Sequence, residues 1–357
     1  MCGMIWKYSD ANGVEKFRKC SGLIGSGDEP ENLDDYLEAG LNGLVWGWKG
    51  DGDLLICQHG KHRIVRINVS DVQADAEQGG SIDSSLVTIL ADAYNNTMLN
   101  SPNDMFLYGS DLYFTDPPFG LQLASADNTF SHAFEIMPQN PSIYVISGDP
   151  GDNVTAVPEK VLDFGKPDHP YGPNGVIVVD NGDLITPITD FSNPHIEVYS
   201  EKDPDVFTRL ETEYSIEGEN ADYPPLNDGA TYSSDLNVVF STSPGGIYMY
   251  DASDSYKFLG FLRINDLVSN VEIGGGYLWM TANRRLLRIP LEQKATTSSP
   301  SANAGETKSP NSSGASSPSS APNGSPSSKE SASSATFVAN FALYSWAAVM
   351  SLIVLFM

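Results

Sequence analysis

The sequence has few cysteines and no cluster of basic residues, and each absence excludes a class of function. Three cysteines occur in 357 residues, Cys2, Cys20 and Cys57, and no C-x-x-C pair is present. A cysteine-based zinc site or a dithiol redox centre is therefore not expected. Cys57 lies in an apolar strand pattern and should be a small buried hydrophobic residue. Basic residues number 20 against 46 acidic ones, a formal net charge of −26, which disfavours nucleic acid as a partner.

The common catalytic motifs are also missing. The sequence contains no G-x-S-x-G, no H-E-x-x-H, no P-loop and no G-x-G-x-x-G, and its five histidines show no metal-ligand spacing. The first residues, M-C-G-M-I-W-K-Y, lack the basic segment and apolar run of a signal peptide. No protein partner is evident from the sequence.

Composition divides the chain into three parts. Residues 1–291 have a globular composition, residues 292–334 form a Ser- and Pro-rich segment expected to be disordered, and residues 335–357 are uncharged and mostly apolar. The last part is long enough to span a membrane. Asn323-Gly324-Ser325, a polar spacer and this apolar tail also match a glycolipid (GPI) anchor signal, which we prefer to a retained transmembrane helix or a soluble form.

An anchored chain of this kind would lie on the extracellular face of a membrane. Asn-x-Ser/Thr sequons fit a secreted glycoprotein, although each is a weak signal by itself. They begin at Asn68, Asn95, Asn153, Asn311 and Asn323.

The globular part repeats a three-part phrase. A small residue or proline, then Asn or Asp, opens an apolar run; a Gly/Asp turn and a second apolar strand follow; a short alternating strand ends the phrase. Short strands broken by turn residues, without long helical periodicity, predict an all-β fold, and the repetition favours a β-propeller over a β-sandwich. The complete copies begin at Leu41, Pro102, Pro173, Asn227 and Ser269, and an incomplete copy covers residues 4–9.

The repeated Asn or Asp should mark one end of a central channel. The innermost strand of each blade lines the channel of a propeller, so a residue just before that strand lies at the channel mouth. A single Asn-Gly or Asp-Gly is usually only a turn. Five such residues at the same position of the repeat instead predict a ring of oxygen atoms, the ligands that Ca²⁺ prefers. They are Asn42, Asn103, Asn174, Asp228 and Asn270.

These motifs resemble the gluconolactonase family, whose wider group includes regucalcin (senescence marker protein) and luciferin-regenerating enzyme. The stretch 99–121 is similar to the family's signature, C-Q-H-G-K-H-R-I-V-R (57–66) to its E-H-G-N-R-R-V-x-R element, and P-N-G-V (173–176) and N-D-G-A (227–230) follow in order. The resemblance covers about residues 40–291. It implies a six-bladed propeller, with the first blade incomplete at the N-terminus.

The resemblance also implies one divalent cation in the channel, Ca²⁺ first, with Zn²⁺, Mg²⁺ or Mn²⁺ as alternatives. Asn174 and Asp228 would be metal ligands, and Asn103 would contact the metal or its bound water and the substrate. A metal-activated water would open a sugar lactone to an aldonic acid, with Asp228 as both ligand and base. His59 and Asp104 match motif positions, and we expect structural roles for them.

One element of the family is missing. Its remaining ligand is a glutamate in an E-G-P-x-W element of the first blade, and no such element occurs here. We hypothesise that the sequence is truncated at its N-terminus, which an upstream reading frame without E-G-P-x-W would contradict. Two other functions stay open: a non-catalytic surface propeller that binds a ligand, and a related esterase or phosphotriesterase.

Overall fold

The computed structural model describes part of the chain: residues 4–19, 40–48, 52–71, 84–121, 136–151, 154–165, 171–190, 193–210, 227–282, 285–291 and 354–356. Every described residue belongs to one compact unit. Apart from short helical turns, the described residues form strands and loops, as predicted.

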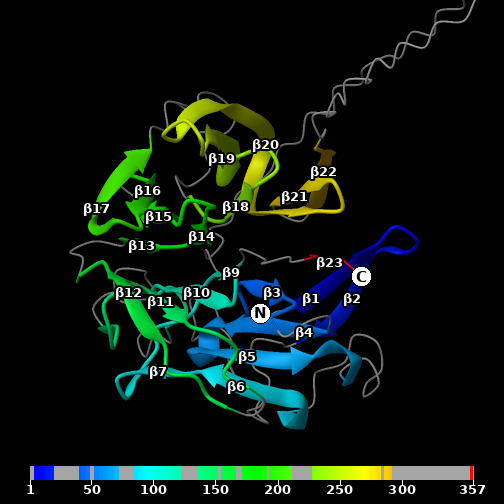
Figure 1. Cartoon of the computed structure of the whole chain (residues 1–357). Helices are drawn as coiled ribbons and strands as arrows, with labels where there is room; N and C mark the ends of the chain where they lie inside the picture. The colour runs from blue at the N-terminus through cyan, green and yellow to red at the C-terminus, as the bar shows by residue number, and fades with distance from the viewer. Residues whose placement is uncertain are drawn as a thin grey trace, which may run out of the picture. The chain divides into compact units, whose positions relative to one another are not determined.

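Five sheets follow one another along the chain and around a common centre (Figure 1). The first contains β1 (Met4–Ser9), β2 (Gly13–Lys19) and β23 (Val354–Phe356). The second contains β3 (Leu44–Trp46), β4 (Asp53–Gln58), β5 (Arg63–Asn68) and β6 (Val87–Ala91). The third contains β9 (Met105–Tyr108), β10 (Asp111–Asp116), β11 (Ser142–Ile146) and β12 (Glu159–Asp163).

The last two sheets have five strands each. The fourth contains β13 (Tyr171–Pro173), β14 (Ile177–Val178), β15 (Leu184–Asp190), β16 (His195–Ser200) and β17 (Asp203–Leu210). The fifth contains β18 (Ala230–Ser233), β19 (Val238–Asp251), β20 (Lys257–Gly274), β21 (Tyr277–Ala282) and β22 (Arg285–Pro290). A small hairpin, β7 (Ala93–Tyr94) and β8 (Thr97–Met98), lies between the second and third sheets in sequence.

The propeller prediction is confirmed, but the predicted number of six blades is wrong. The described residues form five blades, because the fourth and fifth copies of the repeat share one sheet. Strand β20 pairs with β19 through residues 257–267 and with β21 through residues 268–274. No glycine or proline interrupts the sequence around Leu267, so nothing there breaks the strand into two.

Apolar side chains fill the spaces between neighbouring sheets. One cluster joins the second and third sheets through Leu55, Cys57, Met105 and Phe114, so Cys57 is buried as predicted. A second cluster joins the fourth and fifth sheets through aliphatic and aromatic side chains. Each sheet is therefore apolar on the faces that meet its neighbours, as a propeller requires.

Neighbouring inner strands are tied to one another by backbone hydrogen bonds. The N–H of Gly175 donates to the carbonyl of Asp228 at 2.9 Å, and the N–H of Gly229 donates to that of Ser269 at 2.9 Å. The N–H of Gly43 donates in the same way to Asn103. A Cβ atom at Gly175 would lie 2.8 Å from the Asp228 carbonyl oxygen, so glycine is needed for the close approach.

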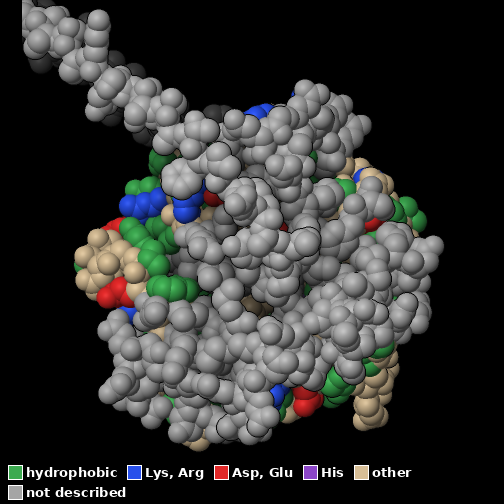
Figure 2. Space-filling view, turned by 180° about the vertical axis from the view of Figure 1, so that it is seen from behind, with side chains coloured by type: hydrophobic (Ala, Val, Ile, Leu, Met, Phe, Trp, Pro, Cys, Tyr) green, Lys and Arg blue, Asp and Glu red, His purple; other side chains and the backbone are tan. Residues whose placement is uncertain are grey.

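The C-terminal region is only partly visible. Residues 292–353 lie outside the described part of the chain, and so do the sequons at Asn153, Asn311 and Asn323. The described end of the chain, β23, pairs in parallel with β1. Among the described residues, no helix has the length and apolar character needed to cross a membrane. Viewed from behind, the described side chains along the edge of the molecule mix acidic, basic and hydrophobic types (Figure 2).

Gly175→Ala should test the close approach of the inner strands. The added methyl group would meet backbone atoms of residues 228–230, which cannot rotate away. We expect a loss of about 1–3 kcal/mol of stability, or about 2–4 °C in melting temperature for each kcal/mol. Val157→Ala, at a side chain that is 81% exposed, is the control and should be nearly neutral. A Gly175→Ala protein as stable as the parent would contradict this account of the inner ring.

Candidate functional site

The predicted mouth residues lie in sequence order around the inner ring. Asn103, Asn174 and Asp228 each come just before an inner strand, and Asn42 occupies the same place in the second sheet. At this point the backbones of the fourth and fifth sheets are joined directly by the hydrogen bond from the N–H of Gly175 to the carbonyl of Asp228. The residues predicted as ligands are thus neighbours around one end of the ring.

The prediction for Asn270 is off by one residue. Ser269 accepts the hydrogen bond from Gly229, as Asp228 accepts the one from Gly175, so Ser269 holds the equivalent position. Asn270 instead matches Gly229, and its Oδ1 accepts a hydrogen bond from the N–H of Val271 at 2.8 Å. Asn270 stands where other copies have Gly43, Gly175 or Gly229, so aligning it with the earlier asparagines displaces the repeat by one residue.

The Asn174 side chain has the geometry expected of a ligand. It is only 9% exposed, and its Nδ2 donates to Thr189 Oγ1 at 2.9 Å. Thr189 in turn donates to the carbonyl of Asn227, the residue before Asp228, at 3.1 Å. With Nδ2 held in this way, the buried Oδ1 of Asn174 has no hydrogen-bond partner in the described part of the chain. An orphaned buried acceptor is uncommon and marks a place where a ligand could bind.

A buried polar network fixes the loop that carries Asn103. The Asp116 carboxylate accepts hydrogen bonds from the N–H groups of Asn100 and Ser101, both at 2.8 Å. Ser101 Oγ donates to the Pro117 carbonyl and accepts from the N–H of Gly120. The polar residues of the stretch 99–121 therefore satisfy one another's hydrogen bonds and keep the loop rigid.

His59 supports the same loop. It is 1% exposed, and its Nδ1 donates to the Pro102 carbonyl at 3.0 Å, next to Asn103. A Cβ atom at Gly120 would lie 2.2 Å from the imidazole ring, so glycine leaves the space for it. The ring also lies close enough to Asp116 to influence that carboxyl group electrostatically. These contacts give His59 a positioning role towards Asn103.

Asp104 and Glu272 bring two carboxyl groups towards the channel. The Asp104 carboxylate accepts hydrogen bonds from the N–H of Met105 and from that of Val176 in the next sheet, yet burial raises its pKa to about 7. The protein around the Glu272 carboxyl group displaces water from it and, together with the negative charge of Asp104, raises its pKa to about 7, although the residue as a whole is exposed. The two groups come from different sheets, so their interaction is across the ring of inner strands.

The oxygen-rich ring fits a hard divalent cation in its chemistry. Asn174 offers a buried, unsatisfied carbonyl oxygen, Asp228 is a half-buried carboxylate, and Asn103, on the preceding sheet of the ring, is nearly fully buried. Within the described ranges, no group of three or more His, Cys, Asp or Glu side chains could hold a metal. A cation here would therefore depend on the amide oxygens of asparagine together with Asp228.

Sequence reasoning missed the residues that orient the ring. Thr189 lies in an ordinary apolar strand, fifteen residues after Asn174, and no motif marks it. Thr115, whose Oγ1 donates to the Asn174 carbonyl at 2.6 Å, lies within the signature but without an evident role. Glu272 could have been found, because it lies two residues after Asn270 and alternate residues of a strand share a face.

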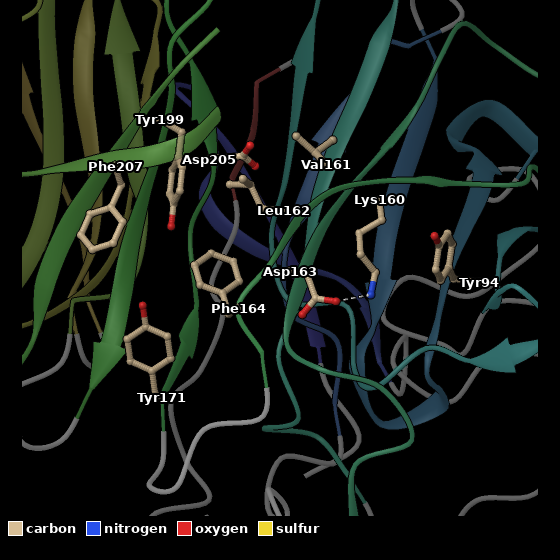
Figure 3. A pocket seen from close by; sticks show the side chains of 10 residues that line it. All are labelled: Tyr94, Lys160, Val161, Leu162, Asp163, Phe164, Tyr171, Tyr199, Asp205 and Phe207. Carbon is tan, nitrogen blue, oxygen red and sulfur yellow. Dashed lines mark hydrogen bonds and ion pairs between the residues drawn. The ribbon is translucent and has the colours of Figure 1, made fainter. Parts of the chain in front are cut away.

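A separate cavity of about 650 Å³ lies away from these residues. It is lined by β12 and β17, their neighbouring loops and several aromatic rings (Figure 3). None of the mouth residues lines it. We place the candidate catalytic site at the inner ring, because the orphaned amide oxygen and the buried carboxyl groups are there.

Comparisons with known proteins agree with the resemblance seen in the motifs. No family model matches the chain. A gluconolactonase from Zymomonas mobilis subsp. mobilis is 26% identical over 299 residues, which cover 79% of this chain and 71% of that protein. The solved structure of a gluconolactonase from Xanthomonas campestris, XC5397, has a TM-score of 0.50 and 20% identity, and covers 72% of this chain and 74% of its own. The first relative confirms the resemblance to gluconolactonases, and the second supports the propeller fold.

Glu272→Gln should change how stability depends on pH. Because the folded-state pKa of about 7 lies above the usual glutamate value of 4.5, the Glu272 contribution is fully present below about pH 4.5 and is lost as pH rises through 7. At pH 8, with chelator present, we therefore expect the variant to melt a few degrees above the parent. At pH 4.5 the two should melt alike.

The exposed Glu159→Gln is the matched control, and it should show no such crossover. Parallel melting curves for the parent and Glu272→Gln across pH 4.5–8 would contradict a raised pKa of the Glu272 carboxyl group.

Proposed function

We propose that this protein is a lactone hydrolase of the gluconolactonase type that opens a sugar lactone to an aldonic acid. The observation that carries the proposal is the unsatisfied buried oxygen of Asn174, in a ring where the Asp228 backbone is one hydrogen bond away. The similarity of the chain to a gluconolactonase supports the substrate class. The two other functions considered, a binding propeller and a related esterase, remain as outcomes of the test.

Asn174, Asp228 and Asn103 would hold a divalent cation. When bound, such a cation polarises a carbonyl and stabilises an oxyanion. Asp228 accepts the proton of the attacking water, whose oxygen forms a bond with the lactone carbonyl carbon. The ring C–O bond then breaks, and the ring oxygen takes up a proton to leave as a hydroxyl group. Thr189 accepts a hydrogen bond from the amide nitrogen of Asn174. The amide oxygen of Asn174 is therefore directed away from Thr189 during the reaction.

Asp228→Asn should remove the activity without unfolding the protein. The substitution keeps the size and backbone of the residue but removes the carboxylate, so we expect hydrolysis of glucono-1,5-lactone to fall by on the order of 10²–10³-fold. Calcium binding, measured by calorimetry, should weaken in parallel. Chelator should abolish lactone hydrolysis by the parent enzyme, and added Ca²⁺, Mg²⁺, Mn²⁺ or Zn²⁺ should restore this activity.

The matched control is Asp180→Asn, an exposed carboxylate on the loop after β14. This variant should keep full activity and bind calcium normally. Full activity of Asp228→Asn would contradict its role as base, whereas a parent protein without turnover of any lactone or ester would favour the binding propeller.

We also propose that the C-terminal tail directs attachment of the chain to the extracellular face of a membrane, with residues 335–357 replaced by a glycolipid anchor in preference to being retained as a helix. Pairing of β23 with β1 and membrane insertion of the same residues exclude each other, so the test decides between them. Phosphatidylinositol-specific phospholipase C should release the protein from cells. Release by detergent alone would favour the helix, and recovery in the soluble fraction would favour the pairing.

A further inference from the structure

An aromatic groove lies on the outer side of the third and fourth blades, apart from the inner ring. Its rings come from Phe164, just after β12, from Tyr171 at the start of β13, from Tyr199 on β16 and from Phe207 on β17 (Figure 3). Neighbouring rings touch, with centroids 6.0 Å apart for Phe164 and Tyr171 and 5.7 Å apart for Tyr199 and Phe207. The Phe207 side chain is 47% exposed, which is unusual for so large an apolar group.

A buried carboxylate holds two of these rings in place. Tyr171 donates to Glu197 Oε1 at 3.0 Å, and Tyr199 donates to Glu197 Oε2 at 2.6 Å. Glu197 is 1% exposed and lies 2.9 Å from His195 Nε2. In Figure 3 the two tyrosine hydroxyls point towards each other beside Phe164. The aromatic wall is therefore formed before any ligand arrives, and little conformational entropy is lost on binding.

The rest of the lining supplies both hydrogen-bond donors and acceptors. Lys160 and Asp163 form an ion pair at 2.9 Å, and Asp205 contributes a second carboxylate. Lys160 lies over the rings of Tyr94 and Tyr144, 5.2 and 5.7 Å from their centroids, so its position is fixed. A ligand with hydroxyl groups can use both kinds of partner, because a hydroxyl donates and accepts.

The properties of the groove select one class of ligand. The protein's net charge of −26 disfavours anions. An organic cation would suit the rings and carboxylates but would gain nothing from Lys160. A cavity of about 650 Å³ has room for several sugar rings, whose C–H faces stack on aromatic side chains. We propose that this groove binds a neutral oligosaccharide, independently of the lactone site.

The test uses the full-length protein and isothermal titration calorimetry with cellotriose, maltotriose and triacetylchitotriose. At least one trisaccharide should bind. Phe207→Ala should weaken that binding roughly tenfold, the effect of losing about 1.4 kcal/mol of aromatic contact. Val206→Ala, at the next position of the same strand and 62% exposed but outside the lining, should change the affinity less than twofold.

Two further measurements keep the outcome clear. Both variants should melt at the temperature of the parent, and Asp205→Asn gives a second, isosteric change in the lining if Phe207→Ala does not fold. The Asp228→Asn protein should bind the trisaccharide unchanged, which separates this groove from the lactone site. Absence of binding by all three sugars would overturn the proposal, as would binding that Phe207→Ala leaves intact. Binding of choline in the groove instead, lost in Phe207→Ala, would assign it to an organic cation.

Discussion

The structure depends on backbone hydrogen bonds that join the inner strands of neighbouring blades. Gly43 and Gly175 each donate an N–H to the next blade, and Gly229 donates one to Ser269 within the fifth sheet, at distances that leave no space for a Cβ atom. Because these contacts are between main chains, they fix the residue just before each glycine at the channel mouth whatever its side chain. In the repeated Asn-Gly and Asp-Gly pairs, glycine therefore allows the close packing of the backbones, and the residue before it presents a polar side chain at the channel mouth.

These separate roles of the glycine and of the residue before it explain what the sequence could predict. The strands of the first three complete copies lie where the repeated phrase placed them, because turn residues and apolar runs are local signals. The ring positions of Asn103, Asn174 and Asp228 follow from the phase of the repeat. The number of blades could not be read in the same way, since no local signal shows that β20 continues without a break from its pairing with β19 to its pairing with β21.

The side-chain orientations in the site were also beyond the sequence. Whether Asn174 turns its oxygen or its nitrogen towards the channel depends on Thr189, and the Thr189 hydroxyl is placed by its bond to the Asn227 carbonyl. Asn270 was misplaced because it occupies the glycine position of the repeat, while the residue at the asparagine position, Ser269, is neither Asn nor Asp. These contacts are tertiary, and each joins residues from different strands.

Several unfavourable energetic terms collect at the centre of the ring. The clusters between blades are apolar and closely packed, whereas the centre holds an unsatisfied amide oxygen and the carboxyl groups of Asp104 and Glu272. An unpaired buried acceptor costs about 1–3 kcal/mol. A fold that needed only stability could place apolar residues there, and the backbone ring would tolerate them. The concentration of these costs on one axis is therefore an argument for function at this centre that needs no comparison with any relative.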